Sequence, residues 1–517
     1  MRLPRWFRLL LLLPVCVLLL IGSGLLLADH LTPAAQGRPS TALPVAGPPT
    51  PLDTELGPLL AAHPGQTGVI WLSDGLDAFA ARSVISQRAG RSLDVMYYIW
   101  HDDIPGHLLA RELHAAAERG VRVRLLLDDL NAHGLDPAMM ALDAHPDIEL
   151  RLYNPFRNRG GLWRLVEMVQ RVFSINHRMH NKAWIADGQV GIIGGRNIGA
   201  EYFDAREDMN FRDLDLLLAG PVVSQASTIF DDYWNSSAVV PIAALNQHDP
   251  KELRALIEQI SRESQEEQAA PYLERLAERA AQPAVREQVI SQWSAHLQIR
   301  SDPPLKHRLD DQRDWLLPVI VDDLQSARSQ VRLISPYFVP GNTGTAALLE
   351  QAARGIDIGV VTNSLAANDV AAVHSGWQAY RPALVDAGIA VHELKRHGRR
   401  HGVAIPFGSS GASLHTKAYL VDGQRGFVGS FNLDPRSANL NTEMGVFFDD
   451  PALGQRLRAE FDQLAAPQLS YRVERDKDGQ LQWRDADNRL YHREPDTRWP
   501  LRAWVHVLSW LPLESQL

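Results

Sequence analysis

Two stretches that lie far apart in the 517-residue sequence place a histidine and a lysine in the same pattern. The first reads "HNKAWIADG" from His180, and the second reads "HTKAYLVDG" from His415. Imidazole can act as a nucleophile or move protons near neutral pH. The ammonium groups of Lys182 and Lys417 can stabilise charge on the non-bridging oxygens of a phosphoryl group. The repeated pattern therefore predicts phosphoryl-transfer chemistry.

An asparagine follows each pattern at the same offset. The segments predicted as return strands, residues 190–193 and 426–428, run into "GGRN", which ends at Asn197, and "GSFN", which ends at Asn432. Glycine lets a backbone approach a ligand closely. Because residues two apart in a strand share a face, we expect each hairpin to present an imidazole, an ammonium and an amide along one edge. One such pattern would be weak, but two copies with the same spacing favour a functional site.

Asp187 and Asp422 complete the two motifs, and a glycine follows each of them. We include both aspartates in the candidate catalytic set because they belong to the repeated motif. The dipeptide Asp-Gly is also typical of a tight hairpin turn. Each aspartate lies an odd number of residues after its histidine, so along a strand the two side chains would point to opposite faces. Their position therefore favours a structural role in the turn.

The elements that must position these residues also occur twice. Apolar runs and helical periodicity predict the order strand, helix, strand in each half of the chain. This pattern indicates an α/β fold with two lobes, each a mixed β-sheet flanked by helices, and a duplication of a whole lobe rather than a short repeat. The predicted elements are residues 93–100, 106–119 and 121–127 in the first half and 331–338, 343–354 and 356–361 in the second.

The N-terminus predicts a membrane anchor. Arg2, Arg5 and Arg8 precede an uncharged run over residues 9–28, about the 20 residues that cross a bilayer as a helix. A cleaved signal peptide is the alternative, but its apolar region is usually shorter. The arginines predict a cytoplasmic N-terminal end, with the rest of the chain across the membrane. The only cysteine, Cys16, lies in this run, so the sequence after it has no disulfide and no thiolate metal site.

Charge narrows the classes of partner and cofactor. The formal net charge is -9, which argues weakly against a duplex nucleic acid, because phosphate binding needs a concentrated basic surface. The lysine beside each histidine would repel a cation. We therefore expect no metal ion and no nucleic acid partner.

Composition shifts suggest six regions along the chain. Dense proline predicts an extended linker, and a segment rich in Glu, Arg, Ala and Leu predicts solvated connecting helices. The predicted regions are 1–28 (basic end and transmembrane anchor, or signal), 29–55 (Pro-rich linker), 56–245 (first lobe), 246–310 (helical connector), 311–465 (second lobe) and 466–517 (C-terminal extension with an amphipathic segment).

Three groups of apolar residues allow two interpretations. In the first interpretation, all three groups pack into the protein core. In the second, the two groups on amphipathic segments face lipid, and the group of aromatic residues at strand ends lines a lipid pocket. The groups are Trp504, Val507, Leu508 and Leu511 in the C-terminal segment, Leu165, Met168, Val169 and Val172 just ahead of the first motif, and Tyr97, Tyr98, Trp100 and Tyr337 at predicted strand ends.

At the two motifs the chain resembles the phospholipase D superfamily, whose signature is H-x-K-x4-D followed by G-[GS]-x-N. The resemblance extends from about Leu76 to Asp462, with both copies intact. Stretches such as "YYIWHDD", "GGRNIGAEYF" and "GSFNLDPRSANLNTEMG" are similar to the cardiolipin synthase branch, particularly its C-type synthases. A single N-terminal apolar segment, where many cardiolipin synthases have two, also favours the C-type.

The resemblance implies that two lobes pack about a pseudo-twofold axis and that both motifs meet in one site. It implies that one histidine attacks phosphorus and forms a phosphohistidine, while the other moves protons for the leaving and entering alcohols. The superfamily usually uses the N-terminal histidine as nucleophile, which assigns attack to His180 and acid–base chemistry to His415. Phosphate ligands carry over as Lys182, Lys417, Asn197 and Asn432. The family chemistry uses no metal and no cofactor.

The resemblance also implies an acidic residue after each motif that orients a catalytic histidine, as in a serine triad. The matching residues are Asp213 in "FRDLDLLLAGP" and Glu443 in "NTEMGVFF". Asp215 lies on the same predicted strand face as Asp213 and remains an alternative.

The expected activity is cardiolipin synthesis, in which a phosphatidyl group passes to phosphatidylglycerol. Phosphatidylethanolamine or a second phosphatidylglycerol is the expected donor. Hydrolysis by a phospholipase D is the main alternative, and a nuclease or a non-catalytic lipid-binding scaffold is less favoured. The expected location is the bacterial inner membrane with the catalytic lobes on the periplasmic side, and an accessory protein remains possible.

Overall fold

The computed structural model describes most of the chain after residue 35. It covers residues 36–517 except 133–134, 162–163, 165–166, 169–170, 172–173, 175, 208, 246–254, 256–257, 259–261, 263–268, 282–289, 291, 309–311, 397–411, 513 and 517. The predicted N-terminal anchor and most of the predicted apolar segment ahead of His180 lie outside the described residues. Within the described residues, no helix is both long enough and apolar enough to cross a membrane.

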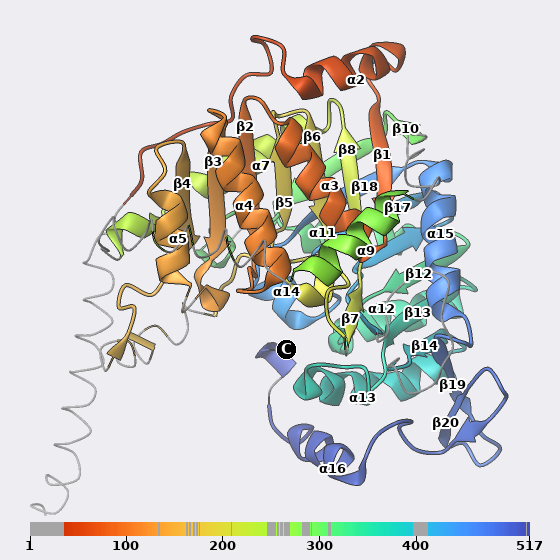
Figure 1. The fold of residues 1–517 in the computed structure, drawn as a ribbon. Helices are drawn as coiled ribbons and strands as arrows, with labels where there is room; N and C mark the ends of the chain where they lie inside the picture. Colours follow the sequence, from red (N-terminus) through yellow and green to blue (C-terminus); the bar gives the residue numbers. More distant parts are fainter. Residues whose placement is uncertain are drawn as a thin grey trace, which may run out of the picture.

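A mixed β-sheet forms the first lobe (Figure 1). Its strands are β1 (Thr67–Leu72), β2 (Ser92–Tyr97), β3 (Arg122–Asp128), β4 (Ile148–Tyr153), β5 (Ala183–Ala186), β6 (Val190–Gly194), β8 (Asp215–Ala219), β9 (Val239–Pro241) and β10 (Gln292–Ser294). Their order across the sheet is β10-β1-β8-β6-β5-β2-β3-β4-β9.

A second mixed sheet forms the second lobe. Its strands are β11 (Leu297–Ser301), β12 (Gln330–Ile334), β13 (Asp357–Asn363), β14 (Ala390–Leu394), β16 (Ala418–Val421), β17 (Arg425–Gly429), β18 (Met444–Asp449), β19 (Ser470–Arg475), β20 (Leu481–Arg484) and β21 (Leu490–Tyr491). Their order is β11-β18-β17-β16-β12-β13-β14-β19-β20-β21.

The two sheets repeat one topology. The run from β1 to β9 in the first sheet matches the run from β11 to β19 in the second, position by position. The strand directions match as well, because β2–β3–β4 and β12–β13–β14 pair in parallel while the neighbouring strands pair antiparallel. The predicted duplication of a whole lobe is therefore confirmed.

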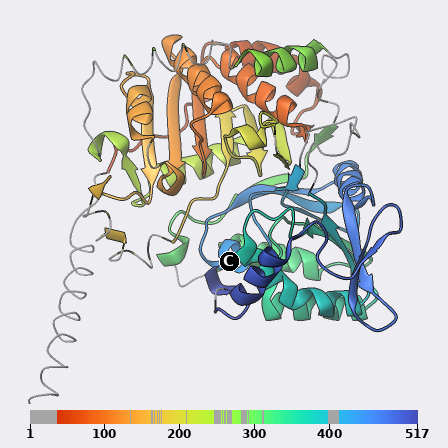
Figure 2. The same cartoon turned by 60° about the horizontal axis from the view of Figure 1, so that its bottom comes forward.

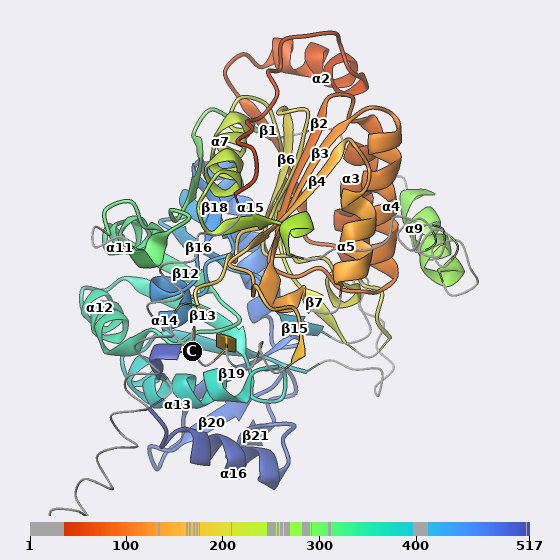
Figure 3. The same cartoon turned by 90° about the vertical axis from the view of Figure 1, so that its left-hand side faces the viewer.

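Helices cover both faces of each sheet. Those of the first lobe are α2 (Pro51–Ala62), α3 (Gly75–Arg88), α4 (Ile104–Glu118), α5 (Asp136–Asp143), α7 (Val223–Trp234) and α9 (Ala270–Ala281). Those of the second are α11 (Leu316–Gln325), α12 (Gly341–Ala353), α13 (Ala371–Asp386), α14 (Pro435–Asn439), α15 (Pro451–Ala465) and α16 (Trp499–Leu508). Figure 3 shows α3, α4 and α5 on one face of the first sheet and α7 on the other.

One apolar core joins the lobes. It combines the inner faces of both sheets with α7, through residues such as Phe230 and Trp234, and with α15, through Leu457 and Phe461. Separate cores lie on the outer face of each sheet. Figure 2 shows the lobes side by side. Because the lobes share a buried core, their relative position is fixed and a site between them can be held in place.

The central strands end earlier than the sequence predicted. β2 ends at Tyr97 and β12 at Ile334, whereas the apolar runs continue to residues 100 and 338. Beyond these points the backbone leaves the sheet in both lobes and forms an isolated β-bridge to the residue after the motif asparagine. The bridges join Trp100 to Ile198 in the first lobe and Phe338 to Leu433 in the second. The apolar run thus continues into the loops that approach the motif residues.

Asp187 and Asp422, which the sequence analysis included in the candidate catalytic set, lie in hairpin turns. Both occupy the left-handed region, with φ of 54° and 52°, in the turns that close the β5–β6 and β16–β17 hairpins. The Asp187 carboxylate accepts hydrogen bonds from the backbone N–H groups of Gly90, Arg91 and Ser92. Asp422 does the same at the start of β12. Each aspartate lies at the end of its strand away from the histidine, a position that favours a structural role in the turn.

The predicted region boundaries differ from the elements in three places. β10 belongs to the first sheet and β11 to the second, so the lobes meet near residue 295 within the predicted connector. β19, β20 and β21 extend the second sheet, so the predicted C-terminal extension is part of that lobe. The described part of the Pro-rich linker binds the first lobe, since Ser40 accepts a hydrogen bond from Trp234 Nε1 at 2.9 Å. Strand pairing and side-chain contacts attach these segments to the lobes, and amino-acid composition alone does not indicate such contacts.

We predict that Asp187→Ala lowers the free energy of unfolding by about 2–3 kcal/mol, because it removes a buried charged acceptor of three hydrogen bonds. It also places alanine in the left-handed region. Asp187→Asn, which keeps an acceptor and tolerates that conformation, should lose less. Urea unfolding measures both values. Activity per folded molecule should stay near wild type, and a large loss of kcat at unchanged stability would return Asp187 to the catalytic set.

Candidate active site

Each His-x-Lys motif lies just ahead of a strand and is held by the other lobe. His180 precedes β5, and its N–H donates to the carbonyl of Thr442 at 2.9 Å. His415 precedes β16, and its N–H donates to the carbonyl of Arg212 at 2.7 Å. A small parallel sheet between β7 (Asn210–Arg212) and β15 (Ala412–Leu414) reinforces the second contact. The sequence analysis expected the motif residues within strands, but they lie just ahead of those strands. Backbone hydrogen bonds between the lobes bring both motifs to one interface.

The two acidic residues that the resemblance indicated do contact the histidines, and the pairs cross between the lobes. Glu443 Oε2 lies 2.8 Å from Nδ1 of His180, and Asp213 Oδ2 lies 2.5 Å from Nδ1 of His415. All four side chains are buried. A carboxylate on Nδ1 fixes the tautomer and stabilises an imidazolium. Each imidazole therefore has Nε2 as its reacting nitrogen.

Asp215, the alternative to Asp213, has a different role. Its carboxylate pairs with the buried guanidinium of Arg82 at 2.8 Å. Strand register shows why it cannot be the equivalent of Glu443: Gly194 pairs with Asp215, whereas the matching Gly429 pairs with Gly445. The counterpart of Glu443 is thus two residues earlier, at Asp213.

The second residue of each Gly-x-x-Asn motif is fitted to its acid. A Cβ at Gly195 would collide with the carboxylate of Asp213. The equivalent Ser430 instead donates from Oγ to Glu443 at 2.5 Å, and Ser437 donates to the other oxygen of Glu443 at 2.8 Å. Glycine makes room for the shorter aspartate, and serine restrains the longer glutamate. The contact with Asp213 therefore explains the glycine at position 195 more directly than close approach of the backbone to a ligand does.

Both motif lysines are buried at the interface. Lys182 Nζ donates to the carbonyl of His180 at 2.5 Å. Lys417 Nζ donates to the carbonyl of His415 and lies 2.8 Å from its Nδ1. Burial lowers the pKa of Lys182 to about 7 and that of Lys417 to about 8, only partly offset by the acidic residues nearby. An anion bound between these ammonium groups would replace the water that each has lost.

The histidines are neutral at physiological pH in this arrangement. Burial lowers the pKa of His180 to about 4 and that of His415 to about 3, and the lysines add to the effect. Burial alone would raise the pKa of the two acids, but the histidines and lysines hold both below their usual values. A neutral imidazole that donates Nδ1–H to a carboxylate keeps the Nε2 lone pair for attack or proton transfer.

The two motif asparagines differ. Asn197 donates from Nδ2 to the hydroxyl of Tyr202 at 2.9 Å and accepts from the N–H of Ile99 at 3.3 Å. Asn432 is buried, and within the described residues its Oδ1 has no hydrogen-bond partner. The Asn432 amide therefore has unused hydrogen-bonding capacity at the site, while the Asn197 amide is already paired.

Aromatic rings pack against both histidines. Tyr98 lies edge to face with His180, 5.0 Å between ring centroids, and Tyr202 and Phe211 each lie 5.1 Å from His415. Tyr98 is the member of the predicted aromatic group that touches a motif histidine. Sequence reasoning missed Tyr202 and Phe211, because nothing in their spacing marks them.

The other predicted aromatics have partners other than the motif histidines. Tyr97 is fully buried and accepts from Arg82 Nε. Trp100 stacks on Trp184. The Tyr337 hydroxyl donates to the carboxylate of Asp369 at 2.8 Å.

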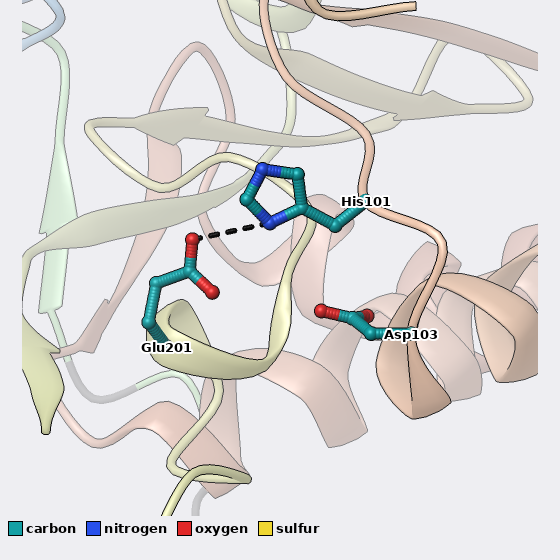
Figure 4. A group of neighbouring side chains, drawn as sticks. All are labelled: His101, Asp103 and Glu201. Atoms are coloured by element: carbon teal, nitrogen blue, oxygen red, sulfur yellow. Dashed lines mark ion pairs between the residues drawn. The ribbon is translucent and has the colours of Figure 1, made fainter. Parts of the chain in front are cut away.

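A histidine and two acidic residues also meet beside the site (Figure 4). Among the described residues, His101, Asp103 and Glu201 are the one group whose ligand atoms lie close enough to share a metal ion. Asp103 already accepts from the N–H groups of Gly106 at 3.0 Å and Ala200 at 2.6 Å. Glu201 pairs with His101 at 3.2 Å. These contacts tie the start of α4 to the loop that follows Asn197, so the group has a structural explanation.

Comparison with known proteins identifies the family. The family model described as "Cardiolipin synthase, PLD-like domain" matches residues 85–234 and 320–465, one match in each lobe. Cardiolipin synthase C of Escherichia coli K12 is 40% identical over 465 residues, which cover 88% of this chain and 98% of that protein. The chain belongs to this family.

More distant relatives agree with this placement. A cardiolipin synthase of Geobacillus kaustophilus is 26% identical over 410 residues, covering 78% of this chain and 68% of that protein. A crystal structure of phosphatidylserine synthase from Haemophilus influenzae Rd KW20 superposes with a TM-score of 0.58 at 14% identity, covering 87% of this chain and 95% of that one. That likeness shows the fold alone, and it extends over both lobes.

The lowered lysine pKa values predict a falling alkaline limb in the pH profile of kcat/KM. If the protonated lysines bind the phosphoryl group, as the resemblance implies, activity should fall as pH rises through about 7 to 8, by roughly tenfold per pH unit for each lysine lost. The guanidinium of a Lys182→Arg variant stays charged. The fall in activity should then begin at a higher pH, set by the pKa of Lys417 alone. Initial rates from pH 5 to 10 provide the measurement, and a profile that is flat to pH 9.5 would contradict the assignment.

Asp213→Asn and Asp215→Asn should separate catalysis from stability. We expect Asp213→Asn to lower kcat by about 10²–10⁴-fold, because His415 loses the carboxylate that orients it. Asp215→Asn leaves the buried Arg82 without its charge partner and should lower the free energy of unfolding by about 3–5 kcal/mol, with kcat per folded molecule nearly unchanged. Steady-state kinetics and urea unfolding of both variants provide the measurement, and reversed effects would exchange the two roles.

Proposed function

We propose that this protein is a cardiolipin synthase that transfers a phosphatidyl group to the hydroxyl of phosphatidylglycerol. The observation that carries the proposal is the pair of crossed histidine–carboxylate contacts at the lobe interface, each with a buried lysine beside it. Such a set suits a two-step displacement at phosphorus, which needs a nucleophile, a proton carrier and cationic ligands. Membership of the cardiolipin synthase family supports the lipid substrates.

In the first step His180 Nε2 attacks phosphorus of the donor lipid, and the phosphorus–oxygen bond to the leaving alcohol breaks. His415, protonated at Nε2, gives that proton to the leaving oxygen. An anionic phosphodiester between the lysines favours this protonated form, because nearby negative charge raises a histidine pKa. The product of the step is a phosphohistidine, with Glu443 on its Nδ1.

In the second step the hydroxyl of phosphatidylglycerol attacks the phosphohistidine. His415, now neutral, takes the hydroxyl proton, and His180 leaves phosphorus with its electron pair. Lys182, Lys417 and the Asn432 amide are the proposed ligands of the phosphoryl oxygens in both steps, with Asn197 joining them if its bond to Tyr202 opens. His180 is assigned as nucleophile from its place as the N-terminal histidine, the usual choice in the superfamily.

The proposed donor is phosphatidylethanolamine or a second phosphatidylglycerol. Hydrolysis differs only in the acceptor, because water would attack the same phosphohistidine and release phosphatidic acid. We further propose that the apolar run over residues 9–28 anchors the protein in the bacterial inner membrane. The arginines that precede it support a periplasmic position for the lobes.

Purified protein in mixed micelles with labelled phosphatidylglycerol should form cardiolipin, measured by chromatography of the lipid products with and without phosphatidylethanolamine. A rate that depends on phosphatidylethanolamine would identify the donor. Phosphatidic acid as the sole product would replace the proposal with phospholipase D activity.

His180→Ala and His415→Ala should each lower turnover by at least about 10³-fold while the protein stays folded, because both steps need both groups. His114→Ala is the matched control, since this histidine lies on α4 away from the lobe interface. Near-wild-type turnover in either motif variant would contradict the shared site.

A further inference from the structure

The α-helix α16, near the C-terminus, carries both buried and exposed apolar side chains. α16 packs on α13 at the outer side of the second lobe (Figures 1 and 3). Val505 and Leu508 are buried on its inner face. The exposed apolar side chains of α16 and of the turn that follows it form what we name the tryptophan face, which consists of Trp499, Trp504, Val507, Trp510 and Leu511.

The tryptophan face is highly exposed. Trp499 and Trp510 are each 73% exposed and Trp504 is 55% exposed. The sequence placed Leu508 with Trp504, Val507 and Leu511 on one face, but the structure turns Leu508 inward and leaves the other three outside. Several large apolar side chains exposed on one short segment mark a candidate binding surface, so the face needs an occupant.

Residue chemistry favours a lipid surface as that occupant. Tryptophan prefers the boundary between acyl chains and headgroups, where its ring is apolar and its N–H meets water. From Arg498 to Pro512 the sequence contains two arginines, one histidine and no acidic residue, although the whole chain has a net charge of -9. This local positive charge complements an anionic surface such as phosphatidylglycerol.

Contacts fix the helix to its lobe. Glu494, just ahead of α16, pairs with the buried Arg381 of α13 at 2.8 Å. After the helix, Glu514 Oε1 accepts from the hydroxyl of Tyr380, also on α13, at 2.5 Å. The tryptophan face therefore has a set orientation relative to the second lobe.

The C-terminal residues then contact the segment just ahead of the first motif. Gln516 bonds to Asn176, four residues before His180. Arg436, four residues after Asn432, bonds to Asn176 Oδ1 at 3.1 Å. The segment that carries the tryptophan face is thus in contact with the chain beside both motifs.

We propose that the tryptophan face lies in the headgroup region of an anionic phospholipid bilayer and holds the active site at that surface. This rests on the proposed function, since it supposes lipid substrates drawn from the bilayer. The face is a docking surface and takes no part in the reaction.

Lipid quenching tests the contact directly. The probe is vesicles of phosphatidylethanolamine and phosphatidylglycerol whose acyl chains carry bromine, which quenches nearby tryptophan. The full-length protein is compared with a triple variant, Trp499→Gln, Trp504→Gln and Trp510→Gln, and the difference in fluorescence reports those three indoles. We expect brominated vesicles to quench most of that difference signal. Trp293→Phe on β10, away from α16, is the matched control and should leave the quenching of the three unchanged.

Kinetics test whether the contact serves the reaction. We expect the triple variant to lose about tenfold in rate on vesicles, while its rate on monomeric short-chain phosphatidylglycerol changes by less than twofold. Arg498→Gln should lower the vesicle rate by up to about fivefold at low salt, the usual contribution of one basic side chain at an anionic membrane. Replacing phosphatidylglycerol by phosphatidylcholine should weaken the quenching.

Distinct outcomes would overturn the proposal. An unquenched difference signal would show that the face does not enter the bilayer. Equal losses on vesicles and monomeric lipid would show that the tryptophans support the fold instead. The wild-type protein could instead self-associate without lipid while the triple variant does not. Together with an unquenched signal, that result would make a second copy of the chain the occupant. If wild type turns over neither lipid form, the proposed function fails, and quenching still decides the docking.

Discussion

The crossed contacts between histidine and carboxylate are the interaction on which the site depends. Each imidazole belongs to one lobe and the acid that orients it belongs to the other. Neither lobe alone can therefore hold a histidine in a defined tautomer. Backbone bonds from His180 to Thr442 and from His415 to Arg212 run in the same crossed sense. The shared apolar core between α7 and α15 makes these short polar contacts possible, because it fixes the lobes at one spacing.

Charge balance in the buried site supports the proposed phosphodiester substrate. Two lysines, two histidines and two acids are removed from water at one interface. With both imidazoles neutral, the two carboxylates balance the two ammonium groups. In the proposed mechanism, a bound phosphodiester adds the negative charge that lets His415 carry a proton. Burial lowers the pKa of both lysines, and the acidic residues nearby offset this effect only in part. In that proposal, binding of the anion and protonation of His415 are one event.

The two halves reach the same geometry with different residues. Gly195 leaves room for Asp213, whereas Ser430 and Ser437 donate hydrogen bonds to the longer Glu443. Asp215 has Gly445 as its counterpart, and its pairing with Arg82 belongs to the first lobe only. The duplication therefore preserves the positions of the reacting groups and allows their supports to diverge.

The sequence by itself determined the α/β class, the duplication and the identity of the paired motif residues, because these depend on local periodicity and exact spacing. It also indicated Asp213 and Glu443 as the orienting acids, through the family resemblance. Only the tertiary structure decided which acid meets which histidine, that Asp187 and Asp422 cap strands away from the site, and that β10 and β11 divide the lobes. Those outcomes depend on which surfaces pack together, and contacts between residues far apart in the chain leave no mark in the spacing of either partner. The same reason explains why Tyr202 and Phe211 were missed and why Leu508 turned inward while Trp504 stayed exposed.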